Sequence, residues 1–128
     1  MNPSKKVVSV IEIDTPSNVE RREPPTLTMD DRGMICDCSR AGETLFGYSL
    51  KDLVWKPISR LLPELSGIQL VKNGKFNSQL AFLSRCGQPF LAVNQLGNIF
   101  LNNLNFVLLN YSGKYAIRVI VQPCGRND

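Results

Sequence analysis

Histidine is absent from the 128 residues of this sequence, and tryptophan occurs only once. The absence of histidine removes the commonest general base, the usual serine and cysteine triads, mixed Cys/His zinc sites and the usual axial haem ligand. The sequence also has no apolar run near the ~20 residues of a membrane-spanning helix, and no charged and then apolar leader. We therefore expect a cytoplasmic protein without a membrane partner.

The excess of positive charge is small. The net charge is +4, from 15 Lys and Arg against 11 Asp and Glu, and the basic residues are scattered along the chain. A nucleic-acid-binding face normally needs a clustered basic stripe, so we expect no direct nucleic-acid partner. The hydrophobic fraction of 43% and the charged fraction of 20% are typical of a soluble globular protein. The length is that of one domain with its own core.

The four cysteines do not follow the spacing of known metal or redox motifs. Cys36 and Cys38 form a C-x-C pair, and Cys86 and Cys124 stand far from it, whereas structural zinc and thioredoxin-type sites use C-x-x-C. We expect reduced cysteines that serve as small core residues. In a strand, Cys36 and Cys38 would point to the same face. A thiol-based redox protein that uses this pair therefore remains an alternative.

The first 25 residues differ from the rest of the chain and are predicted to form an N-terminal arm. They contain four of the eight prolines and none of the nine glycines. Within the arm, the β-branched run Val7 to Ile13 favours a strand. Its exposure to water would be costly, at ~25 cal/mol per Å². We expect it to be buried against its own sheet, a partner or both, and to contribute to a homodimer. Residues 26–123 are predicted to form the domain and 124–128 a tail.

The first part of the domain alternates strands with short helices. Residues 26–29 and 34–38 predict a hairpin around the turn at 30–33, and Ser39 predicts the N-cap of a helix that ends at Gly47. Ser49 and Asp52 have the spacing of a capping box. Pro57 predicts the first position of a third helix over 58–62, which ends before Pro63.

The second part of the domain is dominated by extended runs. Residues 67–74 fit either a loop or a strand, and the apolar spacing over 75–85 favours a helix, although Phe82 lies off its apolar stripe. Residues 90–95, 99–109 and 114–122 predict three strands joined by turns. The order of two strands, several short helices and three strands predicts an α+β fold, in which one antiparallel sheet has short helices packed on one face.

Two stretches of the chain resemble the PAS domain family, and together they cover about three-quarters of it. The first is DDRGMICDCSRAGETLFGYSLKDLVWKPISRLLPEL, and the second is GQPFLAVNQLGNIFLNNLNFVLLNYSGKYAIRVIVQP. In the first, a turn glycine precedes a strand, a short helix ends in an apolar-Gly-Tyr step, a Ser-capped helix carries an Asp-Leu pair, and a Leu-Pro follows. The second is similar to the three closing strands of the family. The resemblance implies a PAS-like five-stranded antiparallel sheet.

The resemblance implies a sensory or interaction module of bacterial-type signal transduction that is not an enzyme. Some PAS domains hold haem, flavin or a metabolite, and others only dimerise. Flavin photosensors of the family carry a cysteine in a GxNCRFLQ-like helix, whereas the corresponding segment here reads GETLFGYS, and the sequence has no histidine to ligate haem. We therefore expect no coloured cofactor and no metal. The remaining candidate is an unidentified small molecule bound between sheet and helices.

The predicted ligand pocket is apolar with one polar group. If one face of the strand 99–109 is directed toward the helices, Asn102 is a polar group among apolar side chains, and a buried amide needs a partner. We expect Asn102 to orient the ligand and Trp55 to form a lid. The alternatives are an amide bonded to backbone and a tryptophan that fills the core. The predicted pocket residues are Phe46, Trp55, Ile58, Leu62, Phe90, Asn102, Leu104 and Phe106.

Three functions remain open at this point. The first is a dimeric sensory module that acts on a signalling effector, in cis or in trans. The second is a purely structural dimerisation module with a filled core. The third is the thiol-based redox protein, which has no histidine to serve as a base, although Arg32 and Arg40 lie near the cysteine pair in sequence.

Overall fold

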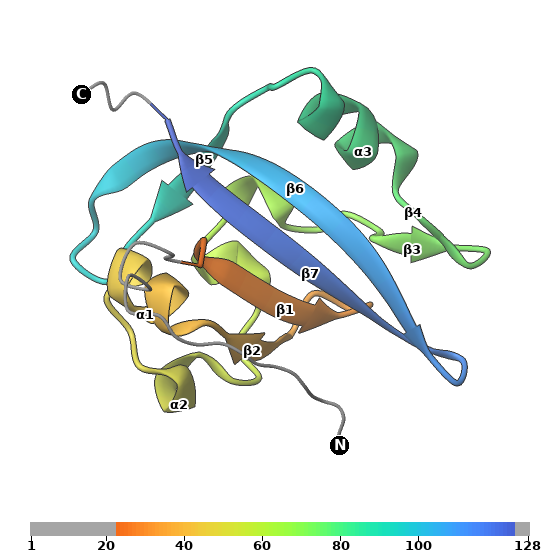
Figure 1. Ribbon diagram of the computed structural model, residues 1–128, viewed down its shortest axis with the longest axis horizontal. Helices are drawn as coiled ribbons and strands as arrows, with labels where there is room; N and C mark the ends of the chain where they lie inside the picture. The colour runs from red at the N-terminus through yellow and green to blue at the C-terminus, as the bar shows by residue number, and fades with distance from the viewer. Residues whose placement is uncertain (1–22, 125–128) are drawn as a thin grey trace, which may run out of the picture.

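The computed structural model describes residues 23–124 (Figure 1), in which five strands form one antiparallel sheet. The strand order is β2-β1-β7-β6-β5. The strands are β1 (Thr26–Asp30), β2 (Ile35–Cys38), β5 (Phe90–Val93), β6 (Ile99–Tyr111) and β7 (Lys114–Pro123). This arrangement confirms the predicted α+β class and the two sets of hairpin-linked strands. The predicted strand Val7–Ile13 and most of the arm lie outside the described residues.

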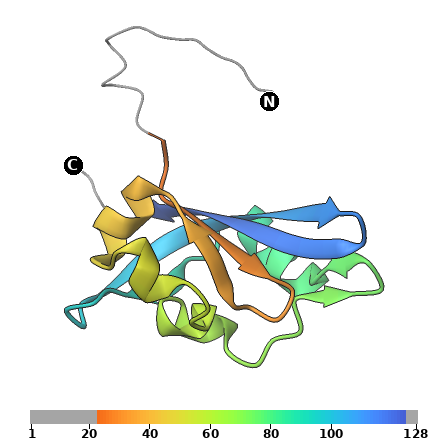
Figure 2. The same ribbon diagram turned by 90° about the horizontal axis from the view of Figure 1, so that it is seen from below.

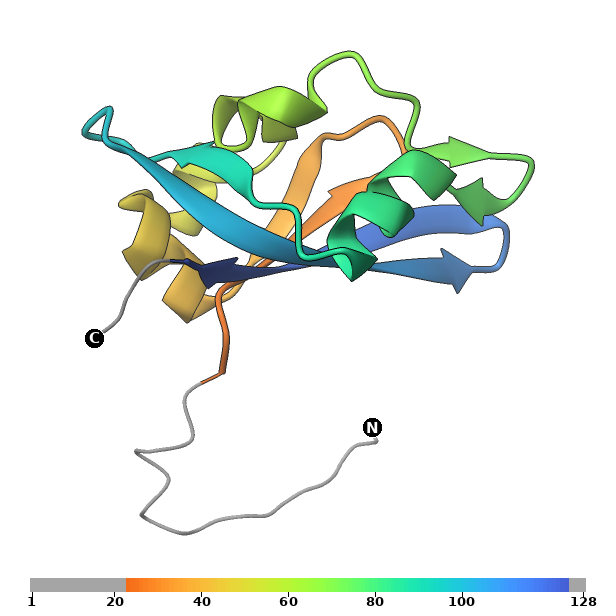
Figure 3. The same cartoon turned by 90° about the horizontal axis from the view of Figure 1, so that it is seen from above.

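The helical segments are short and pack on one face of the sheet (Figures 2 and 3). They are two α-helices and two 3₁₀ helices between β2 and β3, and one α-helix before β5. Their bounds are α1 (Arg40–Phe46), α2 (Leu50–Leu53), η2 (Ile58–Arg60), η3 (Pro63–Leu65) and α3 (Ser78–Arg85). The hydrophobic core lies between these segments and the inner face of the sheet. The opposite, outer face is not covered by any helix among residues 23–124.

The start of α1 is tied to the start of β1 by one hydroxyl. The Oγ of Ser39 accepts from the backbone N–H of Gly42 at 3.0 Å and from that of Thr26 at 2.9 Å. It is therefore an N-cap that also fixes where the first strand begins. The helix ends at Gly47, whose φ of 79° lies in the left-handed region. Both predicted ends of this helix are confirmed.

Two of the predicted helix starts are wrong in detail. Ser49 does not cap α2, because its Oγ donates to the carboxylate of Asp52, while the N–H of Leu50 is taken by the Glu43 carboxylate of the preceding helix. Pro57 is the residue before a helical segment and not its first position, and that segment is a 3₁₀ turn ending at Arg60. Pro63 then opens the second 3₁₀ turn, η3, which we did not predict.

The predicted helix over 75–85 is also shorter than expected. Residues 71–72 and 75–76 form a small hairpin, β3 (Val71–Lys72) and β4 (Lys75–Phe76). The helix begins only after Asn77, whose side-chain oxygen accepts from the N–H of Leu80 at 2.9 Å. Phe76 therefore belongs to a strand, and Phe82 is 54% exposed, as its place off the apolar stripe predicted.

Candidate functional site

The inner face of β6 provides one wall of the candidate site. Because side chains alternate along a strand, Phe100, Asn102, Leu104 and Phe106 all point toward the helices. Asn102 and Leu104 are fully buried or nearly so, whereas their neighbours Leu101 and Asn105 are exposed on the other face. The expected direction of this strand face is therefore found.

Aromatic rings surround the centre of this wall. The Phe90 and Phe106 rings meet edge to face at 6.2 Å, and Phe76 lies 4.9 Å from Phe106. The Phe46 ring of α1 lies 6.0 Å from that of Phe100. Edge-to-face and tilted pairs at these distances add to the stabilisation from burial. Phe76 was not among the predicted residues, because the sequence placed it in a helix.

The helical layer completes the site. Ile58 of η2 and Leu62, which follows it, are buried in the same core as Phe46, Phe90 and Leu104. The layer is held to the sheet by backbone bonds, since the N–H of Val93 donates to the carbonyl of Leu61 at 2.9 Å. The site therefore forms where β5 and β6 face the short helices.

Asn102 is the one buried polar residue in this part of the described core. It lies opposite Phe90 of β5 and Pro123 of β7. Its side-chain NH₂ donates to the carbonyl of Phe100 at 3.4 Å, while its Oδ1 has no hydrogen-bond donor among residues 23–124. A buried acceptor without a donor costs about 1–3 kcal/mol. The oxygen of this buried amide is therefore without a hydrogen-bond partner among the described residues.

Trp55 lies apart from the other seven predicted residues. Its side chain is 60% exposed, and its backbone φ is 65°, in the left-handed region that non-glycine residues seldom adopt. Its N–H donates to the carbonyl of Ile35 at 2.7 Å, which ties the segment after α2 to the edge of β2. The backbone of Trp55 thus forms a hydrogen bond to the edge strand β2, while its indole is directed to the surface and not to the core.

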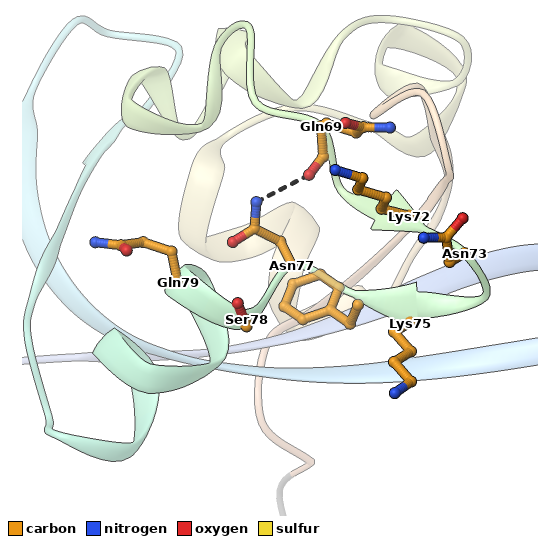
Figure 4. A pocket seen from close by; sticks show the side chains of 8 residues that line it. Gln69, Lys72, Asn73, Lys75, Asn77, Ser78 and Gln79 are labelled. Atoms are coloured by element: carbon orange, nitrogen blue, oxygen red, sulfur yellow. Dashed lines mark hydrogen bonds between the residues drawn. The ribbon is translucent and has the colours of Figure 1, made fainter.

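A surface hollow of about 520 Å³ lies beside the β3–β4 hairpin (Figure 4). Figure 4 shows Lys72 extending toward Gln69, while Lys75 points away. Asn77 uses both ends of its amide, because its Nδ2 donates to the Gln69 carbonyl at 2.9 Å and its Oδ1 caps α3. The amide of Asn77 is thus already paired at both ends. We did not predict this hollow from the sequence. The Asn73-Gly74 pair, which is typical of a hairpin turn, was the one feature that could have indicated the hairpin beside it.

The cysteine pair lies in an environment that holds the thiols protonated. Burial raises the pKa of Cys38 to about 11, and the nearby carboxylates of Glu43 and Asp37 act in the same direction. Burial, Asp30 and Asp37 also raise the pKa of Cys36. Since the thiolate is the nucleophile and the metal ligand, neither group is activated at neutral pH. Among residues 23–124, no three His, Cys, Asp or Glu side chains gather as a metal site would require.

No helix within residues 23–124 is long and apolar enough to cross a bilayer. No protein-family model matches the sequence, and no curated protein matches it at a significant level.

Solved structures give the informative comparison. A PAS domain of a two-component sensor histidine kinase superposes with a TM-score of 0.60 at 13% identity, covering 78% of this chain and 84% of that one. A PAS domain from Colwellia psychrerythraea gives 0.60 at 16% identity, covering 86% and 94%. The PAS domain of nitrogen regulation protein NR(II) from Vibrio parahaemolyticus gives 0.54 at 19% identity, covering 77% and 87%. By its strand order, its helices on one face and these superpositions, the chain has the fold of a PAS domain.

Proposed function

We propose that this protein is a non-catalytic sensory module of signal transduction that binds a small molecule between its sheet and its helices. Asn102 orients the molecule, and six apolar side chains surround it. These are Phe46, Ile58, Leu62, Phe90, Leu104 and Phe106. The module acts on a signalling effector, which is a domain of the same protein or a separate protein.

The unpaired oxygen of Asn102 carries this proposal. Small-molecule sites are mostly apolar, with a few polar groups that fix the orientation of the ligand. Asn102 is 0% exposed, and its Oδ1 lacks a donor among the described residues. A ligand that presents an N–H or O–H to this oxygen would satisfy it. The ligand would thereby recover the free energy that the unpaired amide costs.

The comparisons support the signalling role. One similar structure comes from a sensor histidine kinase, another from a nitrogen regulation protein, and a third from a light-oxygen-voltage domain studied with a flavin analogue. Haem and photochemical flavin are not proposed here, since the sequence has no histidine and no cysteine in the helix 40–46. We expect a colourless protein, and a visible absorbance band that persists through gel filtration would contradict this.

Mass spectrometry of the molecules released on denaturation tests the proposal. We expect the wild-type protein to release a small molecule in proportion to protein, and Asn102→Leu to release little of it. Asn105→Leu is the matched control, because Asn105 lies on the outer face of the same strand. An equal yield from wild type and Asn102→Leu, or no released molecule from either, would contradict the proposal.

A second candidate, dimerisation, is supported by the outer face of the sheet. At one end of that face Leu91 lies directly opposite Leu101, and Val93 opposite Ile99. Leu91, Leu101 and Ile99 are 37%, 45% and 66% exposed. Grouped apolar side chains on an uncovered sheet face are typical of contact with a partner. We infer that a second copy of the chain packs here, with a contribution from the arm.

Light scattering of the full chain tests the dimer. Leu101→Lys is expected to convert the dimer to a monomer. Phe82→Lys, at a 54% exposed position of α3 on the helical side of the sheet, should leave the dimer unchanged. A wild-type monomer, or a Leu101→Lys dimer, would contradict the inference.

A further inference from the structure

The short hairpin of β3 and β4 places two lysines directly opposite each other. Its turn is Asn73-Gly74, with φ values of 53° and 74°, and two successive positive φ values are typical of a type I′ hairpin turn. This turn fixes the register, so that Lys72 pairs with Lys75 across the hairpin. Figure 4 shows the two side chains leaving the hairpin in different directions, which separates their charges. Since like charges at directly opposite positions are destabilising, a negative charge near both would stabilise the hairpin.

No carboxylate compensates this pair in the described part of the chain. Between residues 23 and 124 the one ion pair is that of Arg32 and Asp30, so neither Lys72 nor Lys75 has an Asp or Glu oxygen within 4.0 Å. The lining of the hollow beside the hairpin contains no Asp or Glu either. The remaining polar side chains of this lining are neutral amides and one hydroxyl, from Gln69, Asn73, Asn77, Ser78 and Gln79. The hollow is therefore electropositive.

The walls of the hollow are held by contacts that do not involve the lysine side chains. The amide of Asn77 bonds the Gln69 carbonyl on one side and the N–H of Leu80 on the other, both at 2.9 Å. The hairpin is anchored to the core, because the Phe76 ring lies 4.9 Å from that of Phe106. A site whose walls are already fixed loses less entropy when a ligand binds.

We propose that this hollow binds the phosphate group of a small phosphorylated molecule between Lys72 and Lys75. A phosphate monoester carries about −1.5 to −2 charges at neutral pH, which matches two ammonium groups, whereas a carboxylate matches only one. Each lysine presents three donors on a flexible stem, so both side chains can turn toward one anion. The volume of about 520 Å³ lies within the ~300–1,000 Å³ of small-molecule sites, and it leaves space for the organic part of the ligand beside Gln69 and Gln79. The inference does not depend on a ligand at Asn102.

An NMR titration of the full chain tests the proposed site. Glycerol 3-phosphate is added to ¹⁵N-labelled protein, and inorganic phosphate and acetate are added in parallel at equal ionic strength. We expect glycerol 3-phosphate to cause saturable shifts of the backbone N–H signals of Asn73, Gly74 and Lys75. Inorganic phosphate should bind more weakly, because it makes no contact with the rest of the hollow. Acetate should bind at least about tenfold more weakly, because it engages only one of the two lysines.

Substitutions that remove one charge each locate the bound phosphate. Lys72→Gln and Lys75→Gln should each weaken the binding of glycerol 3-phosphate about tenfold, because each removes one hydrogen bond to a charged group. Lys51→Gln is the matched control, because it removes the same charge at an exposed position of α2, away from the hairpin in Figures 1 and 3. This control should bind as the wild type does. The side chains of Lys72 and Lys75 are exposed, so we expect the spectra of both variants to remain those of the folded protein.

Three results would overturn the proposal. The first is the absence of saturable shifts in the hairpin with glycerol 3-phosphate. The second is an equal loss of binding in Lys51→Gln and Lys72→Gln, which would indicate attraction to the net positive charge of the protein. The third is binding of inorganic phosphate or acetate as tight as that of glycerol 3-phosphate, which would show that the hollow does not select a phosphorylated molecule.

Discussion

The side-chain NH₂ of Asn102 donates to the carbonyl of Phe100, two residues earlier on the same face of β6, at 3.4 Å. The bond is long, and it leaves the other end of the amide without a donor in the described core. An amide held in this way contributes little to stability. Its position at the centre of an apolar wall is the basis of the ligand proposal.

Two substitutions of Asn102 are expected to change the stability of the ligand-free protein in opposite directions. In ligand-free protein, Asn102→Leu is expected to raise the free energy of unfolding by about 1 kcal/mol, because it removes an unsatisfied buried acceptor. Asn102→Asp should lower it by ~2 kcal/mol or more, because it buries a charge without a partner. Urea unfolding measures both changes. A Leu variant clearly less stable than wild type would show that the amide is already satisfied.

Ser39 is expected to contribute far more to the stability of the protein than Ser49. Its Oγ accepts from two backbone N–H groups, those of Gly42 and Thr26, so Ser39→Ala should cost about 1–2 kcal/mol of unfolding free energy. Ser49 makes no cap bond and only donates to the exposed Asp52. Ser49→Ala should therefore change stability by less than about 0.5 kcal/mol. Thermal or urea unfolding of the two variants checks the order, and equal losses would refute it.

Position 42 requires glycine because neighbouring atoms leave no room for a Cβ, and not because of its backbone angles. A Cβ at this position would lie 2.7 Å from the Sγ of Cys38 and 3.2 Å from the carbonyl oxygen of Thr26. Gly42→Ala is expected to destabilise the protein by about 1–3 kcal/mol through overpacking. Cys38→Ala in the same chain should restore part of the loss. Additive effects of the two changes in a double-mutant cycle would contradict this contact.

The raised pKa of Cys38 predicts a loss of stability at alkaline pH. The folded thiol keeps its proton up to a pKa of about 11, whereas the unfolded thiol loses it near 9.0. The folded state therefore binds more protons in this interval, and the contribution of Cys38 to stability falls as pH rises from about 9 to about 11. Urea unfolding at several pH values should show a smaller decline for Cys38→Ala. Equal declines in both proteins would argue against the shift.

The fold was predictable from the sequence because the residues that start and end its helices and turns act on their near neighbours in the chain. Ser39 and Gly47 bound α1 through bonds within a few residues, and Ser112-Gly113 closes the last hairpin, with φ values of 55° and 89°. The starts of α2 and α3 were less predictable, because they depend on other elements. The N–H of Leu50 is satisfied by Glu43, seven residues back, and Phe76 is held in a strand next to Phe106.

The candidate site was predictable only in part. Strand alternation placed Asn102 on the inner face, since a period of two fixes which side each residue takes. The exposure of Trp55 was not predictable, because neither its positive φ nor the bond of its N–H to Ile35 has a local sequence signal, and its role as a lid stays a prediction. The length of β6 that pairs with β5 was not predictable, because pairing between distant segments is not visible in one sequence.

A crystal structure of the protein as purified tests the central claim most directly. We predict that a small molecule lies between the sheet and the helices, with an N–H or O–H donor about 2.7–3.2 Å from the Oδ1 of Asn102. An interior filled only by protein side chains, with Asn102 bonded to backbone alone, would contradict ligand sensing and leave dimerisation as the function.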